Sequence, residues 1–425
     1  MEKVEYVLTN IPLVLERIFS FLSARDLLRL QSVCKSWKSC SADVLRGRKS
    51  VNQVEYITYV KNCDEDKQTV KFKRSNRQMT WKKNSSMYKE FSEWRNEWHC
   101  APTAGISVSM SNDRIINSFN YDHENMIRYW LPPANKLLTL RSVYSVVCVD
   151  SEKASIENIV DDISDVFNYI SFPQSLSNLF SVNYFNLEEE HSSEDHDKFI
   201  QTVGDELEHC DTKLVFVSVV SKDSSLSPLH KNILKPAACR GVVVIGCIFE
   251  TLIIFNPDNG PANSTNGIQD YVIVSFKGKN VRSASVLVGS HVDTIKELNA
   301  CLETLQETVK SFGANCPNMC KFKNKFGHCA SCNSQTLGFM VACCSRANPQ
   351  EWYVEEDTDD FADVPRNLEQ EAFRKMIPNV PLLGIYGMGE IGGFINLIGH
   401  QEKLFDQNSD LIKRESTVFA VVMLK

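Results

Sequence analysis

The sequence predicts an α+β protein: a small all-α N-terminal unit of three helices, followed by a mixed α/β body with largely antiparallel sheet. Three observations support this prediction. Apolar residues recur at helical spacing over the first fifty residues, whereas β-branched runs bounded by Gly, Pro, Asn and Asp dominate from residue 213 onward. The length of 425 residues indicates two or three domains, because a domain commonly holds about 100–200 residues.

The N-terminal unit, residues 5–50, opens at Pro12, where a missing N–H removes no helical hydrogen bond. Ser23 followed by Asp26 resembles a capping box at the start of the second helix. Each helix carries large apolar residues: Leu15, Ile18, Phe19 and Leu22 in the first, Leu27, Leu28 and Leu30 in the second, Val33, Cys34 and Trp37 in the third. A unit of this length cannot bury all of these apolar side chains. We therefore expect some of them to remain on its surface and to bind a partner.

These residues resemble an F-box. Family members share a Leu-Pro near the start, a Leu-x-x-Ile-Phe core, an Asp-Leu pair and a Val-Cys-x-x-Trp ending, and this chain differs only in Ile11 for the first Leu. The resemblance implies binding to the Skp1 adaptor and, through it, to cullin and RING subunits. The residues implied to contact Skp1 are Ile11, Pro12, Leu15, Ile18, Phe19, Leu22, Leu27, Leu30, Val33 and Trp37. The alternative is a helical hairpin that only caps the next domain.

Residues 51–100 are predicted to be a basic connector with the first strands. The alternation from Val51 to Tyr59 indicates a strand. Residues 67–89 hold eight Lys or Arg residues and no acidic residue, with aromatic residues among them. Such a run could place cations on phosphates and aromatic rings under bases. A solvated connector is the preferred interpretation, because no RNA-binding motif accompanies the run.

The segment from residue 96 to residue 209 carries the weakest pattern. Residues 137–150 are typical of a strand, and residues 156–180 mix helical spacing with an apolar run. Residues 188–197 are predicted to be a charged loop. Its two histidines, His191 and His196, are interpreted as hydrated side chains rather than metal ligands.

The pattern sharpens from Lys213 to the C-terminus. Strands are predicted at 214–220, 241–248, 271–276, 283–288, 336–344, 381–386 and 418–424, and helices at 292–312 and 367–376. The strands are rich in β-branched residues, so we expect them to be buried on at least one face.

The second half of this body resembles the C-terminal half of FIST domains, which are sensory and interaction domains of intracellular signalling. The resemblance covers the strand 337–343, the helix around Phe373 and a turn that follows the strand at 381–386. The motif residues of this turn are Gly387, Gly389, Glu390 and Gly392. The resemblance implies a FIST-like domain over residues 101–425, with the motif region at about 213–400.

The spacing Gly387-x-Gly389-x-x-Gly392 also mimics a dinucleotide-binding fingerprint. That interpretation fails on context, because a strand-like segment follows instead of a helix and only 33 residues remain. Glu390 is interpreted as a buried, hydrogen-bonded turn residue, since no paired base is visible. The remaining enzyme interpretation is a nucleophile at Cys343 or Cys344 working with a histidine.

Two cysteine pairs lie eight residues apart, Cys316-x-x-x-Cys320 and Cys329-x-x-Cys332. Four thiolates from two short hooks suit a tetrahedral structural zinc with Zn–S bonds of about 2.3 Å. Unpaired reduced thiols in a loop are the alternative, because the chain holds 15 cysteines. No other cofactor is required.

Composition and charge argue against several classes of protein. Hydrophobic residues make up 43% of the chain, too many for a disordered protein, and the net charge of −7 argues against nucleic acid as a partner. The start lacks an apolar signal segment, and the longest apolar run, 241–255, is too short to span a membrane and is interrupted by Glu250. We therefore expect reduced cysteines and a place in the cytoplasm or nucleus.

The F-box and FIST resemblances together imply the substrate-recognition subunit of an SCF (Skp1–cullin–F-box) E3 ubiquitin ligase. Such a subunit is not an enzyme. It holds a protein target for ubiquitination and proteasomal degradation, and catalysis comes from proximity. The alternatives are a small-molecule sensor coupled to the F-box and, third, an enzyme that uses Glu390 or Cys343.

Overall fold

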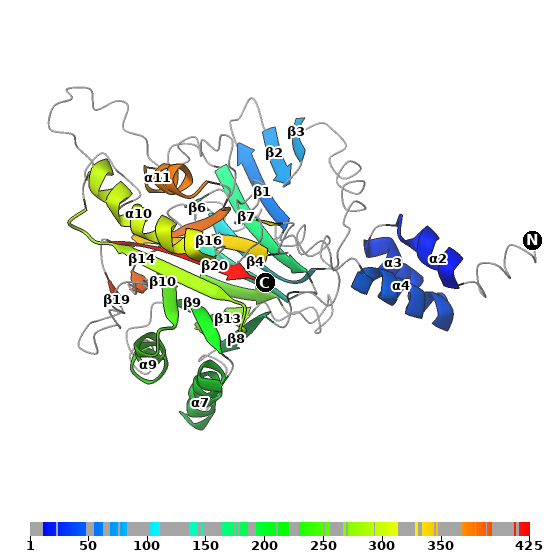
Figure 1. Ribbon diagram of the computed structural model, residues 1–425, viewed down its shortest axis with the longest axis horizontal. Coiled ribbons are helices and arrows are strands. Elements are labelled where there is room, and N and C mark those ends of the chain that lie inside the picture. The colour runs from blue at the N-terminus through cyan, green and yellow to red at the C-terminus, as the bar shows by residue number, and fades with distance from the viewer. Residues whose placement is uncertain are drawn as a thin grey trace, which may run out of the picture.

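The computed structural model confirms the α+β class (Figure 1). It describes residues 12–22, 24–47, 55–62, 69–74, 77–82, 102–110, 136–142, 146–147, 164–173, 176, 179–185, 193–209, 211–220, 229–249, 251–255, 267–268, 271–292, 294–312, 328–329, 334–343, 346, 368–378, 380–387, 389–392, 412–413 and 416–425.

Three helices form the N-terminal unit, as predicted: α2 (Pro12–Phe19), α3 (Ala24–Leu30) and α4 (Lys35–Gly47). Pro12 is the first residue of α2, the position where proline is tolerated best. The unit has a small apolar core of its own, and in Figure 1 its helices lie to one side of the sheets.

Within the described residues, the first of three sheets contains eight strands. Their order is β12 (Gly267–Ile268), β11 (Thr251–Phe255), β5 (Lys136–Ser142), β4 (Pro102–Met110), β7 (Ser164–Pro173), β1 (Glu55–Asn62), β2 (Thr69–Arg74) and β3 (Arg77–Lys82). Strands lie within residues 51–100, the segment predicted to be a basic connector with the first strands, and β2 and β3 of the basic run form an antiparallel hairpin on β1.

The second and third sheets carry most of the core. The second has the order β19 (Ile412–Lys413), β18 (Glu390–Gly392), β10 (Val243–Phe249), β9 (Thr212–Val220), β13 (Tyr271–Lys277) and β8 (Phe180–Phe185). The third has the order β14 (Arg282–Val288), β20 (Thr417–Leu424), β16 (Ser334–Cys343), β17 (Leu382–Gly387) and β6 (Val146–Val147), with β15 (His328–Cys329) beside β16. Among the described strands, only the pairs β4/β5, β9/β10 and β16/β17 are parallel, so the pairing is largely antiparallel.

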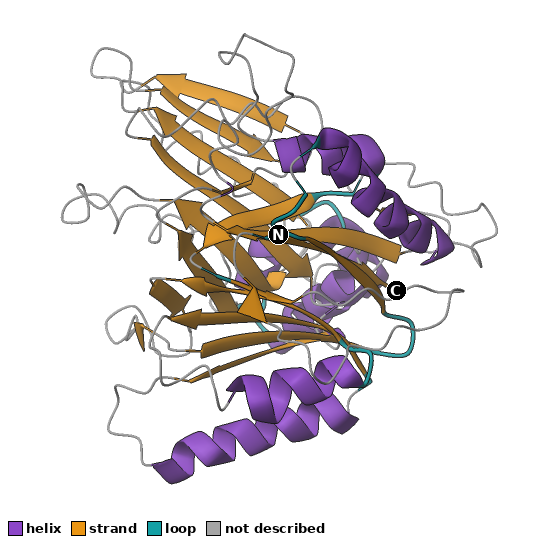
Figure 2. Ribbon diagram, turned by 90° about the vertical axis from the view of Figure 1, so that its left-hand side faces the viewer, coloured by secondary structure: helices purple, strands orange, loops and turns teal. Residues whose placement is uncertain are grey.

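Helices cover the outer faces of these two sheets (Figure 2). The helix α7 (Ser193–His209), the π-helical turn η4 (His230–Leu234) and α9 (Lys235–Cys239) share one apolar core with the second sheet. The helices α10 (Ile295–Phe312) and α11 (Leu368–Met376) share another with the third sheet. The prediction of a charged loop over 188–197 is wrong for its last five residues, because α7 begins at Ser193.

The long apolar run at 241–255 becomes two strands of different sheets, β10 and β11. Each strand is therefore short, and the apolar length of the run reflects two strands in succession. Within the part of the chain that the structure describes, no helix is long and apolar enough to cross a membrane.

Candidate functional site

The core of the N-terminal helices is built from one side of each helix. Leu15, Phe19 and Leu27 are 1%, 2% and 0% exposed, and Val44 joins them. The ring of Phe19 meets the ring of Trp37 edge to face, with centroids 5.4 Å apart and an interplanar angle of 81°. This is a favourable geometry for an aromatic pair, and it ties α2 to α4.

The other side of α2 is apolar and exposed. Leu13 and Phe21 are both 77% exposed, and Ile18 is 42% exposed. Val33, between α3 and α4, is 58% exposed. The guanidinium of Arg17 lies 5.4 Å from the centroid of the Phe21 ring, where a cation attracts the aromatic face. Together with Val14, these are the exposed large apolar residues of the described N-terminal unit, and we call this set the helical patch: Leu13, Val14, Ile18, Phe21 and Val33.

The structure divides the residues that were predicted to contact Skp1. The half-buried members, Leu22, Leu30 and Trp37, pack against the helical core formed by Leu15, Phe19 and Leu27. Only Ile18 and Val33 of the predicted set belong to the exposed helical patch. Ile11 and the side chain of Pro12 lie outside the described residues. Whether the set binds Skp1 stays a prediction.

Sequence reasoning missed Leu13, Val14 and Phe21 as candidate contact residues. The signal was present in the spacing, because Leu13, Arg17 and Phe21 follow one another every four residues. Leu13 and Arg17 lie on the side of α2 opposite Leu15 and Phe19, and Phe21 lies in the turn just after the helix. Large apolar residues on both sides of one short helix indicate one buried side and one side for a partner.

The turn between β17 and β18 is the second site. Glycine is required at Gly387, because a Cβ there would overlap the Sγ of Cys247. Gly392 has φ +144°, a conformation that favours glycine, and a Cβ there would lie 2.6 Å from the Val244 carbonyl oxygen. Residues 390–392 form a strand, which is incompatible with the helix that a dinucleotide-binding fingerprint must open.

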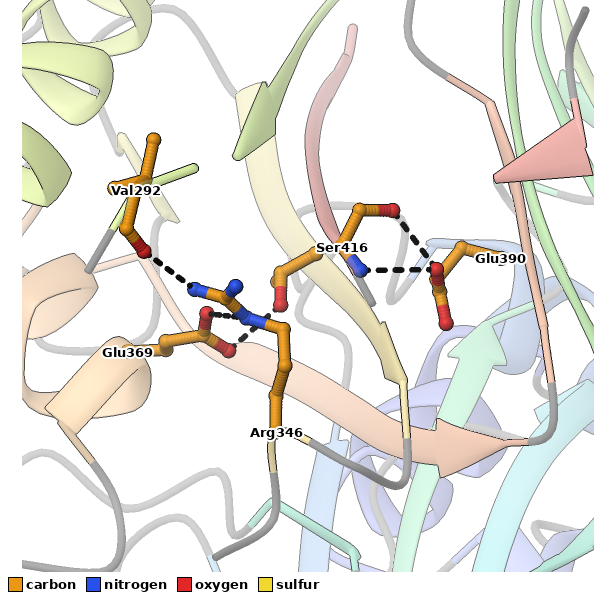
Figure 3. A network of polar contacts seen from close by, with 6 residues as sticks. Val292, Arg346, Glu369, Glu390 and Ser416 are labelled. Atoms are coloured by element: carbon orange, nitrogen blue, oxygen red, sulfur yellow. Dashed lines mark hydrogen bonds and ion pairs between the residues drawn. The ribbon is translucent and has the colours of Figure 1, made fainter. Parts of the chain in front are cut away.

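Glu390 is fully buried at this turn, at 0% exposure. One carboxylate oxygen, Oε2, accepts hydrogen bonds from the backbone N of Ser416 at 3.2 Å and from its Oγ at 2.8 Å (Figure 3). Burial raises the pKa of Glu390, and the bonds from Ser416 oppose that rise. The other oxygen, Oε1, has no hydrogen bond of good geometry among the described residues, although the adjacent Cys343 thiol also lowers the pKa of Glu390.

Two buried thiols accompany this carboxylate. Cys247 lies directly across the strand pair from Glu390 and is 0% exposed, and Cys343 on β16 is 7% exposed. Burial, and after it the charge of Glu390, raises the pKa of Cys247 well above its ordinary value. A protonated, buried thiol is a poor nucleophile, because the thiolate is the reactive form. The geometry therefore suits packing rather than covalent chemistry. Cys344 lies outside the described residues.

A buried ion pair adjoins the turn. Arg346 and Glu369 are 2% and 3% exposed, and the Arg346 Nε donates to the Glu369 Oε1 at 2.8 Å. The same guanidinium donates to the Val292 carbonyl oxygen at 3.3 Å (Figure 3), and the Thr417 hydroxyl donates to the Glu369 Oε2 at 2.7 Å. This network joins Arg346, three residues after the end of β16, to α11, to the segment before α10 and to β20.

The start of β20 links the two buried carboxylates, because Ser416 bonds Glu390 and its neighbour Thr417 bonds Glu369. The Cys343 backbone N donates to the Ser416 carbonyl oxygen at 3.0 Å. The turn and the ion pair are thus one connected polar cluster inside the apolar body. Every one of its side chains is buried, which favours a structural role.

The predicted zinc site lies almost wholly outside the described residues. Cys316, Cys320 and Cys332 lie outside the described residues, and Cys329 is described only as part of the backbone of β15. No group of three or more metal-binding side chains comes together in the described part of the chain. Among the described residues, the cysteines with described side chains form no disulfide bond: Cys34, Cys40, Cys239, Cys247, Cys301 and Cys343.

Comparison with known protein families shows that residues 12–46 match the F-box-like family. The N-terminal helices therefore form an F-box-like domain. Two relatives extend the similarity into the sheet body. The proteins named F-box only protein 22 of Homo sapiens and of Pongo abelii are each 22% identical to this chain over 404 residues, covering 91% of this chain and 85% of the relative. The chain therefore has an F-box-like match at its N-terminal helices and, over most of its length, resembles F-box only protein 22.

Proposed function

We propose that this protein is the substrate-recognition subunit of an SCF E3 ubiquitin ligase. The F-box-like helices bind Skp1, and through it cullin and RING subunits, while the FIST-like sheet body holds a protein target for ubiquitination and proteasomal degradation. Assembly with these subunits implies a place in the cytoplasm or nucleus. The observation that carries the proposal is the helical patch, since five large apolar side chains lie outside the core of a domain that matches the F-box-like family.

The energetics of the helical patch favour a protein partner. Burying a large apolar side chain is worth about 1.5–3 kcal/mol, and Leu13 and Phe21 have most of their surface available for such burial. The four buried apolar residues of the helical core contribute little to independent stability, because small units bury too small a fraction of their surface. A partner that covers the helical patch therefore stabilises the helices as it binds.

Adaptor function needs no catalytic group in this chain. Holding a target lysine near a ubiquitin thioester raises the effective concentration of the two reactants, which accelerates transfer without new covalent chemistry. The burial of Glu390 and Cys343 supports this interpretation over an enzyme, because a reacting group must contact its substrate.

The test measures the affinity of the full chain for purified Skp1 by titration calorimetry. Leu13→Ala with Phe21→Ala should weaken binding roughly a hundredfold, since the pair forfeits about 3 kcal/mol of apolar burial. Ile295→Ala is the matched control, because Ile295 is an apolar residue of α10 in the sheet body and is 41% exposed. Unchanged Skp1 affinity in the double variant, with its helical circular dichroism intact, would contradict the proposed docking surface.

A further inference from the structure

The thiol of Cys247 points from the second sheet toward the third. Cys247 on β10 lies directly opposite Glu390 on β18, and residues that face each other across a strand pair share one face of the sheet. That face is turned toward the third sheet, because the Glu390 carboxylate accepts hydrogen bonds from Ser416, the residue just before β20 (Figure 3). Cys247 therefore lies in the layer between the two sheets.

The thiol of Cys343 enters the same layer from the third sheet. Side chains alternate between the two faces of a strand, and Phe339 and Val341 of β16 belong to the core that the third sheet shares with the second. Met340 belongs instead to the core under α10 and α11. The alternation places Cys343 on the same face as Phe339 and Val341. In agreement, the Cys343 thiol is close enough to the Glu390 carboxylate to lower its pKa.

Gly387 fixes how far apart the two thiols lie. It is the partner of Cys343 in the parallel pair β16/β17, and paired strands lie about 4.8 Å apart. A Cβ on Gly387 would overlap the Sγ of Cys247 and would lie 3.5 Å from its Cβ. With these two offsets at right angles, the Cβ atoms of Cys247 and Cys343 are roughly 6 Å apart. A disulfide needs a Cβ separation of about 3.5–4.5 Å, so a movement of about 2 Å at the end of β16 closes the bond.

We propose that Cys247 and Cys343 form a reversible disulfide that locks the second sheet to the third under oxidising conditions. The oxidant is a small peroxide: two thiols and one hydrogen peroxide give one disulfide and two waters. The first sulfur attacks a peroxide oxygen, which breaks the O–O bond and gives a sulfenic acid and water. The second sulfur then attacks the first, and the sulfenic oxygen leaves as water. The inference goes beyond the proposed function and does not depend on it.

A cross-link makes smaller demands on a thiol than catalysis does. Burial raises the pKa of Cys247, so its reactive thiolate is scarce and the bond forms slowly, but one reaction per chain is sufficient. The Glu390 carboxylate lies beside both thiols and can accept the proton that each attacking sulfur releases. Cys343, at 7% exposure, is less buried than Cys247 and is the expected site of the first oxidation.

The experiment oxidises the reduced full chain with hydrogen peroxide and maps cross-links in the monomer fraction by mass spectrometry. Trypsin releases Cys247 within residues 241–277 and Cys343 within residues 326–346. Most monomers should yield these two peptides joined, two hydrogen atoms lighter than their sum, and dithiothreitol should separate them. Oxidation of the exposed Cys34 in the same sample shows that the peroxide dose is sufficient.

Serine variants assign the cross-link to one pair of cysteines. Cys247→Ser and Cys343→Ser should each abolish it, and Cys344→Ser, one position along the chain, is the matched control that should keep it. Far-UV circular dichroism checks that each variant is folded. The disulfide closes a loop of about a hundred residues, so oxidation should raise the guanidinium midpoint of the unmutated chain and of Cys344→Ser. The midpoints of Cys247→Ser and Cys343→Ser should not rise.

Three outcomes would overturn the proposal. They are the absence of joined peptides at a dose that oxidises Cys34, joined peptides that persist in Cys343→Ser, and an unchanged midpoint in the cross-linked chain. The first and third are measured on the unmutated chain, so they hold even where a variant fails to fold. Either of them would leave Cys247 and Cys343 as thiols that only pack between the sheets.

Discussion

The ion pair between Arg346 and Glu369 offers the sharpest test of the interpretation that the polar cluster is structural. Its charged atoms lie 2.8 Å apart, and the two side chains are 0% and 3% exposed. We consider three variants: Arg346→Met, Glu369→Met and the double variant. Methionine keeps much of the volume of either side chain and carries no charge, so each single variant leaves one charge buried without its partner.

The magnitudes follow from the cost of a buried, unpaired charge. Removing one partner of a buried ion pair commonly costs 3–5 kcal/mol, so each single variant should lose about that much free energy of unfolding. The double variant leaves no charge and loses the hydrogen bonds of the Val292 carbonyl and the Thr417 hydroxyl, at about 1–3 kcal/mol each. The double variant should therefore lose several kcal/mol less free energy of unfolding than the summed losses of the two single variants.

The assay is guanidinium denaturation followed by far-UV circular dichroism, with midpoints and slopes compared across the cycle. The control is Lys198→Met, which removes an ion pair to Asp195 whose atoms are 4.0 Å apart and whose side chains are 65% and 45% exposed. An exposed pair of this kind contributes at most about 1 kcal/mol. Additive single effects, or single effects as small as the control, would refute the assignment of a tightly coupled pair.

Three further predictions follow. Burial raises the pKa of Glu390, so the folded chain keeps the carboxyl proton at a pH where the unfolded chain loses it. The contribution of Glu390 to the free energy of unfolding is therefore full at low pH and is lost as pH rises through the raised pKa. Glu390→Gln should remove that decline, and its melting temperature relative to the unmutated chain should rise with pH; a constant difference would contradict this. Gly387→Ala should lower the free energy of unfolding by about 1–3 kcal/mol in denaturant melts, because the added Cβ overlaps buried atoms. Its control is Gly204→Ala, in α7 with open space around it, which should raise the free energy of unfolding by up to about 1 kcal/mol. Equal effects of the two substitutions would contradict the predicted overlap. Finally, we expect one zinc per chain by elemental analysis, lost when Cys329 and Cys332 become serine; metal-free protein would leave these residues as ordinary thiols.

Strands of the second and third sheets could be predicted closely because burial on both faces selects continuous β-branched runs. The expected strand at 271–276 is β13 at 271–277, and the expected strand at 418–424 is β20 at 417–424. Helix α10 also matches the expected helix, since Leu298, Leu302 and Leu305 repeat at helical spacing and are all buried. The hydrophobic pattern alone determines these elements.

The basic run at residues 67–89 does not by itself predict the hairpin β2–β3, because lysines and arginines are equally common in solvated connectors. The side-chain period of a strand is two, and Val70, Phe72, Met79 and Trp81 obey it on both sides of the turn. This alternation is the signal in the sequence that indicates two strands. The place of the hairpin at the edge of an eight-stranded sheet depends on pairing with β1, which local sequence does not encode.

The polar cluster could be predicted only in part. A buried, hydrogen-bonded Glu390 was expected, but its partner Ser416 is 26 residues away, and Arg346 pairs with a glutamate 23 residues further along the chain. Such pairs are set by which strands lie side by side. A single sequence shows that a turn glutamate needs partners, because a buried carboxylate without hydrogen bonds is costly, and it does not show which groups supply them.

The split of the F-box-like helices into core and patch changes how substitutions in them should be interpreted. Replacing Leu15, which is 1% exposed, opens a cavity and costs about 2–5 kcal/mol of folding free energy, so it weakens Skp1 binding by depleting the folded helices. Replacing Phe21, which is 77% exposed, removes contact area and leaves the core intact. Only the second class of substitution reports on the interface itself. In a Leu15→Ala variant, saturating Skp1 should restore the binding that is lost. In a Phe21→Ala variant, binding should weaken while the helix content stays unchanged. Together these two results would separate folding from recognition in this domain.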